Sequence, residues 1–114
     1  MIATNKKVKY QSTGVVYGRY WGGGEGAYRA TPMYGATKEE LLAKANNALA
    51  IGSLDGGMGY ERLLGAKLDI ATITTVEIEG KTFENIEYEM EFIEIADGAL
   101  TEDAREFLEF EVEM

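Results

Sequence analysis

The chain has 114 residues, a formal net charge of −9, and neither cysteine nor histidine. This length suits one domain with one core, and the lack of cysteine excludes a disulfide framework, a thiolate nucleophile and a Cys-ligated metal. The lack of histidine removes the usual general base and the commonest metal ligand. No apolar run approaches the ~20 residues of a membrane span, so we expect one soluble, cytoplasmic domain over residues 1–114.

The N-terminal part of the chain predicts three strands. Residues 8–12 and 13–21 together hold three Val, three Tyr and one Trp, residue types that suit strands. Residues 22–26 hold four glycines and predict a hairpin loop, after which residues 27–34 resume in extended form. Pro32 cannot donate a ladder hydrogen bond, so it predicts an edge strand or a bulge.

One helix is predicted from Thr37 to a stop at Gly52. Thr37 and Glu40 have the spacing of a capping box, in which the hydroxyl accepts the Glu40 N–H and the carboxylate reaches back. Apolar residues then recur at helical spacing: Leu41, Leu42, Ala45, Ala48 and Leu49. A second glycine-rich loop follows, and residues 60–64 suggest a short helical turn.

A long antiparallel hairpin is predicted over residues 70–95. Glu79 and Gly80 supply a two-residue turn, which places Val76 opposite Phe83. Residues 86–92 alternate strictly between apolar and polar positions, as in a strand with one buried and one wet face. The apolar residues switch from one strand face to the other near residue 73 and again between residues 83 and 86. Each switch predicts a bulge or twist.

A closing helix capped by Thr101 completes the predicted fold. Its expected buried stripe is Ala104, Phe107, Leu108 and Val112. The order β-β-β-α-β-β-α with hairpin-length connections indicates an α+β two-layer domain, an antiparallel sheet of about five strands with helices on one face.

Acidic residues are concentrated at the C-terminal end of the chain. Residues 77–114 hold 14 acidic and two basic residues, whereas residues 1–76 hold six acidic and nine basic ones. Glu87, Glu89 and Glu91 share one strand face, with neighbouring carboxylates roughly 6 to 7 Å apart. Two interpretations stay open. The glutamates form a solvated face that prevents unwanted pairing of the sheet, or they form a surface that imitates a phosphate backbone and binds a basic protein.

Other patterns point to chemistry less specifically. Residues 22–27 match a dinucleotide fingerprint in letters, but a strand follows where that motif needs a helix, and Glu25 would lie among the phosphates. Asp69, Glu79 and Lys81 have the spacing of a metal-dependent nuclease pattern. Lysines interleave with aromatic residues near the N-terminus, a composition that can bind single strands, although the overall charge opposes it.

As a small, acidic, cysteine-free chain with glycine-rich loops, this sequence resembles the inhibitors that phages and mobile elements carry against bacterial defence, such as anti-CRISPR proteins. The resemblance implies a non-enzymatic protein without cofactor that works in the host cytoplasm. It implies a basic partner, such as an RNA-guided nuclease effector, and no direct contact with nucleic acid or membrane. The expected contact residues are Glu87, Glu89, Glu91 and Glu94, with Trp21 and Glu25 as a second contact. The alternatives are a nuclease using Asp69, Glu79 and Lys81, or a self-associating structural protein such as a homodimer.

Overall fold

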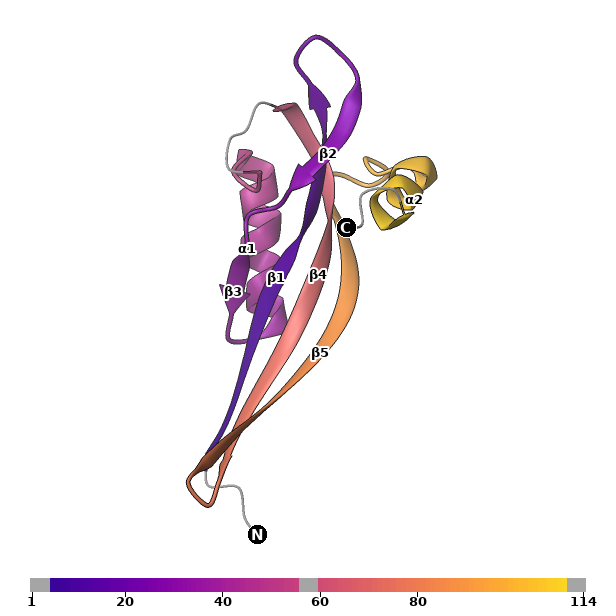
Figure 1. Ribbon diagram of the computed structural model, residues 1–114. Coiled ribbons are helices and arrows are strands. Elements are labelled where there is room, and N and C mark those ends of the chain that lie inside the picture. The colour runs from indigo at the N-terminus through magenta and orange to yellow at the C-terminus, as the bar shows by residue number, and fades with distance from the viewer. Residues whose placement is uncertain (1–4, 56–59, 111–114) are drawn as a thin grey trace.

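One antiparallel sheet organises the molecule (Figure 1). The computed structural model describes residues 5–55 and 60–110. Its elements are β1 (Asn5–Tyr20), β2 (Glu25–Arg29), β3 (Met33–Gly35), α1 (Lys38–Ile51), β4 (Tyr60–Ile78), β5 (Lys81–Glu94) and α2 (Glu102–Phe110). The strands lie in the order β2-β1-β4-β5, and β3 also pairs with β1. The predicted α+β class, the five-stranded antiparallel sheet and the element order are confirmed. None of the described helices is long and apolar enough to cross a membrane.

The first long strand is continuous where two strands were expected. β1 pairs with β4 from Asn5 to Tyr20, and Gly14 lies within that ladder with φ of +145°. A Cβ at Gly14 would lie 2.0 Å from the carbonyl oxygen of Lys67, so only glycine permits this approach of the two strands. Residues 60–64 belong to β4 and not to the expected helical turn.

The β4–β5 hairpin has the predicted turn and an uninterrupted register. Glu79 and Gly80 have φ of 50° and 77°, as a two-residue type I′ turn requires, and Val76 pairs with Phe83. The bulges expected within this hairpin are absent from its register, which runs unbroken from Gly65 to Ile78. The apolar residues instead switch from one face of the strand to the other because both faces are exposed over residues 81–90. The sheet's register shifts lie instead between β1 and β4, near Tyr17 and Tyr20.

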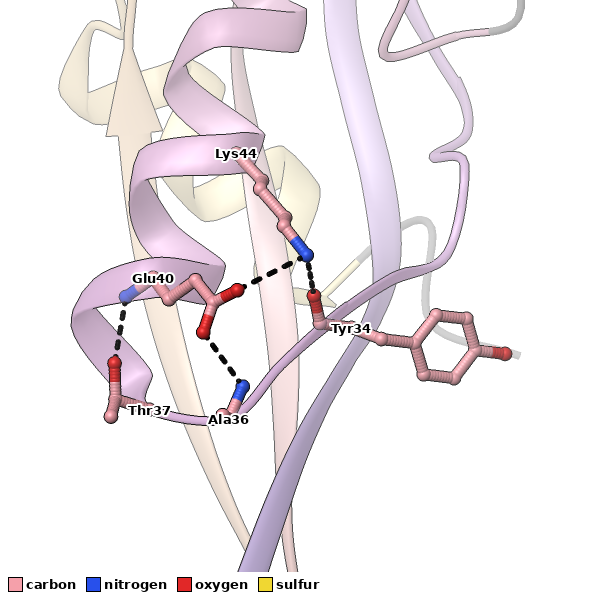
Figure 2. Close-up of polar contacts among 5 residues, drawn as sticks. All are labelled: Tyr34, Ala36, Thr37, Glu40 and Lys44. Atoms are coloured by element: carbon pink, nitrogen blue, oxygen red, sulfur yellow. Dashed lines mark hydrogen bonds and ion pairs between the residues drawn. The ribbon is translucent and has the colours of Figure 1, made fainter.

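The capping box fixes the start of α1 (Figure 2). Thr37 Oγ1 accepts a hydrogen bond from the Glu40 N–H at 3.1 Å, and Glu40 Oε2 accepts one from the Ala36 N–H at 3.0 Å. Lys44 forms an ion pair with Glu40 at 3.5 Å and donates to the Tyr34 carbonyl at 2.8 Å. The first turn of α1 is therefore tied to the end of β3, and this tie sets where the helix lies on the sheet.

The two helices lie on opposite faces of the sheet, which corrects the expectation of one face. Val16 belongs to the core beneath α1, whereas its neighbours Val15 and Tyr17 pack in the cluster beneath α2. Adjacent residues of a strand point to opposite faces, so the two cores are separated by the sheet. Figure 1 shows α1 and α2 on the two sides of it. The apolar residues of β1 and β4 supply both cores, so neither helix needs the other.

The closing helix α2 begins as predicted and buries part of the expected stripe. Thr101 Oγ1 accepts a hydrogen bond from the Ala104 N–H at 3.1 Å. Ala104 and Leu108 are buried, while Phe107 is half-exposed with its ring centroid 6.1 Å from that of Tyr17. Val112, the last residue of the expected stripe, lies outside the described residues.

The three longest strands extend well past the helices. The molecule measures 60 × 26 × 23 Å. In Figure 1 the tip of the β4–β5 hairpin lies far beyond the lower end of α1. We call residues 5–9, 72–78 and 81–87 the distal arm. Neither helix covers the end of this arm, so its two outer strands are exposed at residues 6–9 and 81–87, while Ile73 in the central strand stays buried.

Candidate functional site

β5 is an edge strand with a long free side. It is last in the strand order, and its whole length pairs with β4. Within the part of the chain that the structure describes, no strand pairs with its other side. Residues 81–90 are all exposed. Such an edge offers a row of unpaired backbone N–H and C=O groups that can accept another strand.

The predicted row of glutamates does share one face of β5, and that face is the α1 side. Glu89 pairs with Ile70 and Glu91 with Leu68, both of which belong to the core beneath α1. Lys38, the first residue of α1, lies 3.0 Å from Glu89 Oε1 and 2.9 Å from Glu91 Oε1. Two of the three carboxylates thus help to fasten the helix to the sheet.

The charge of Lys38 is stabilised by these two contacts. Hydrogen bonds to the carboxylates of Glu91 and Glu89 raise the pKa of the Lys38 ammonium above its ordinary value of 10.5. The three side chains remain one third to one half exposed, so the field of the two carboxylates is reduced and not removed. The cation that compensates them lies 53 residues from Glu91 in the chain.

Glu94 is held inside the fold and organises the connection to α2. Its carboxylate accepts hydrogen bonds from the Leu100 N–H at 2.8 Å and the Gly98 N–H at 3.3 Å, and Arg105 lies 3.3 Å from Oε1. The bond from Leu100 is the main reason why the pKa of Glu94 is below its ordinary value of 4.5. Its side chain is only 20% exposed, so Glu94 has a structural task.

Glu84 and Glu87 are the acidic residues of β5 that do not link the strand to a helix or loop. Both are exposed, and neither has an ion pair among the described residues. They lie on opposite faces of the strand, because their positions differ by an odd number. Glu84 lies outside the strict alternation of residues 86–92, so the sequence pattern gave no signal for it.

The apolar face of β5, expected to be buried, is exposed instead. Tyr88 is 74% exposed, Met90 41% and Ile86 40%, while Phe83 on the other face is 50% exposed. These side chains point away from α1 or lie beyond its end, and α2 packs only near residue 92. The free edge of β5 therefore combines carboxylates with apolar contact area. The changes of apolar parity in the sequence were the signal of this two-sided exposure.

No family model, curated protein or solved structure matches this chain. Its function is therefore inferred from the geometry of its surfaces.

The opposite edge of the distal arm is basic, because Lys6, Lys7 and Lys9 of β1 are exposed there. Among the described residues, this end of β1 pairs only with β4. The arm thus has one basic edge and one acidic edge.

The predicted second contact, Trp21 and Glu25, lies at the other end of the molecule from the arm (Figure 1). Trp21 is 70% exposed and borders a cavity of about 330 Å³. Glu25 accepts a hydrogen bond from the Tyr17 hydroxyl at 2.9 Å. Burial and this bond raise the pKa of Tyr17 to about 12. The glycine loop enters strand β2 and not a helix, so it lacks the geometry of a dinucleotide site.

The three residues of the nuclease pattern do not meet. Asp69 pairs with Met90 in the middle of the sheet, whereas Glu79 lies in the turn at the tip of the arm and Lys81 directly follows that turn. Asp69 and Glu79 are ten positions apart along an extended chain, a span of roughly 30 Å. Among residues 5–55 and 60–110, no group of three His, Cys, Asp or Glu residues could hold a metal ion. The structure therefore does not bring the three residues of the predicted nuclease site together.

Proposed function

We propose that this chain is a non-enzymatic binding protein that captures an extended, basic segment of another protein along the free edge of β5. The observation that carries the proposal is the uninterrupted exposure of residues 81–90 on an edge strand. Strand addition to such an edge gives affinity through backbone hydrogen bonds and specificity through alternate side chains. The exposed acids select a basic segment, and the apolar side chains between them add contact area.

The charge pattern also supports a partner other than β5 of a second copy. Pairing two copies of β5 would bring rows of glutamates opposite each other, and like charges directly opposite are destabilising. A basic strand meets no such repulsion. The anti-CRISPR-like inhibitor that the sequence suggested is one form of this proposal, in which the captured segment belongs to the nucleic-acid channel of an effector.

A peptide of about ten residues with alternating lysine and valine is a direct probe of this edge. We expect saturable binding that weakens at high salt, together with slower hydrogen exchange of outward-facing β5 amides. The same peptide with backbone N-methyl groups on its pairing side should lose binding. Binding by charge attraction alone would not be affected by these methyl groups. Equal binding of a glutamate–valine peptide would contradict the proposal.

Matched double variants separate the acidic edge from overall charge. Glu84→Lys with Glu87→Lys should weaken binding of the basic peptide about tenfold or more, because each charge lies beside side chains of the captured strand on its own face of the sheet. Asp97→Lys with Glu106→Lys makes the same change in net charge at exposed positions away from the edge and should change binding little. Glu89 and Glu91 are avoided, since reversing them would also repel Lys38. Identical affinities for both double variants would contradict the role of the edge.

One observation favours self-association as a second candidate. The distal arm carries lysines along β1 and glutamates along β5, so the basic edge of one copy complements the acidic edge of the next. Such head-to-tail contacts form rings or filaments. Sedimentation equilibrium distinguishes the two functions, because a capture module stays monomeric whereas edge pairing raises the mass with concentration and reverses with salt.

A further inference from the structure

A groove of about 1220 Å³ lies on the α2 face of the sheet, beyond the helix. Its floor is four strands wide: Ala27 and Arg29 come from β2, Val15 from β1, Lys67 and Asp69 from β4, and Met90 from β5. At the same level the other face of the sheet is covered by the α1 core. The groove is therefore an open, partly apolar surface that the described part of the chain leaves unfilled.

Lys67 places a nearly buried charge in the groove floor. The residue is 6% exposed, and its side chain 8%. Its ammonium forms an ion pair with Asp69 Oδ2 at 3.9 Å, a distance too long for a hydrogen bond. An ammonium has three donors, and this ion pair satisfies none of them with a hydrogen bond. An acceptor that entered the groove would meet a charge already in place.

Arg29 adds a second cation to the same row. Val15 pairs with Arg29 on one side and with Lys67 on the other, so all three side chains point to the α2 face. Two strand spacings separate the outer residues, roughly 10 Å between their backbones. Arg29 is exposed, and no ion pair within the described residues uses it. An anionic group above Val15 lies within reach of both long side chains.

The charges and the apolar floor together define the chemical class of the ligand. Of the charged residues that line the groove, Lys67, Arg29 and Asp69 point to its face of the sheet, whereas the Glu89 carboxylate lies on the α1 face with Lys38. The side chains on the groove's own face therefore carry one surplus positive charge. Val15, Ala27 and Met90 provide apolar contact beside it. We infer that the groove binds a small molecule that carries one carboxylate on an apolar body. Ligand sites commonly join an apolar lining to a few placed polar groups. This inference does not depend on the capture of a basic segment by β5.

Decanoate is a suitable probe, and the methionine methyl groups report its position. In protein labelled with ¹³C at the methionine methyls, decanoate should shift the Met90 signal saturably. The Met33 signal should stay in place, because Met33 packs against the core on the other face of the sheet. Decanol, which has the apolar body without the charge, should bind at least about tenfold more weakly. Absence of a saturable Met90 shift, or equal binding of decanol, would overturn the inference.

Variants then test the two cations. Lys67→Met keeps the length of the side chain and should weaken decanoate binding about tenfold or more while leaving decanol binding within about twofold. Lys9→Met is the control, because Lys9 is an exposed lysine of β1 outside the groove. If Lys67→Met does not fold, as judged by circular dichroism, Arg29→Met gives the decisive comparison and should also weaken decanoate selectively. Unchanged decanoate affinity in the folded variant would contradict the inference.

Discussion

The ammonium of Lys38 lies 2.9 Å from Glu91 Oε1 and 3.0 Å from Glu89 Oε1, joining the first turn of α1 to the edge strand. Glu89 and Glu91 therefore have two tasks, since they hold the helix and also contribute to the acidic edge. Glu84 and Glu87 contribute only to the edge. This division decides which acidic residues can be changed without disturbing the fold.

Replacing Lys38 with methionine should lower the melting temperature, and the loss should shrink at high salt because the contacts are part-exposed. The folded state raises the pKa of Lys38, so its stabilising contribution is complete below 10.5 and is lost as the pH rises through the folded value. The gap between wild type and variant, measured by thermal melts, should therefore close above pH 10.5. A gap that stays constant across this range would show that packing of the side chain is responsible.

Replacing Glu94 with glutamine should loosen α2 and lower stability at neutral pH. The folded state lowers the pKa of Glu94, so its contribution is present above 4.5 and is lost as the pH falls through the folded value. Denaturant unfolding at several pH values should show the variant's deficit disappearing in acid. Glu106→Gln, at an exposed position of α2, is the control and should show no such deficit. A deficit that persists in acid would contradict the role of the charge.

Replacing Gly14 with alanine should destabilise the protein by about 3 kcal/mol or more, because strain at positive φ adds to a backbone clash. The new Cβ would lie 2.0 Å from the Lys67 carbonyl oxygen. Gly23 also has positive φ, but a Cβ there meets nothing within 4 Å. Its alanine variant should therefore lose only about 1 kcal/mol in the same urea titration. Similar losses at the two positions would mean that β1 and β4 can move apart.

Replacing Ser12 with alanine should leave stability unchanged or raise it by up to about 1 kcal/mol. Ser12 is fully buried beneath α1, and its hydroxyl has no hydrogen-bond partner. Thr101→Ala provides the contrast, because that hydroxyl caps α2 and its loss should cost about 1 kcal/mol. The melting temperatures of the two variants should shift in opposite directions or differ clearly. A marked loss on replacing Ser12 would indicate an unrecognised polar contact.

The sequence by itself determined the local features of this protein. Thr37 and Glu40 define the start of α1 because capping involves groups only a few residues apart. Glu79 and Gly80 define the hairpin turn, and with it the pairing of Val76 and Phe83, because turn length sets the register. The shared face of Glu87, Glu89 and Glu91 follows from the period of two residues in a strand.

Only the tertiary structure decided what those faces meet. It placed α1 and α2 on opposite sides of the sheet, left Tyr88 and Met90 exposed, and brought Lys38 to Glu89 and Glu91. It also separated Asp69 from Glu79 and enclosed Lys67 in a groove floor. The physical reason is that a strand's period tells which residues share a face, while the neighbours of that face depend on how far a helix from elsewhere in the chain reaches along the sheet.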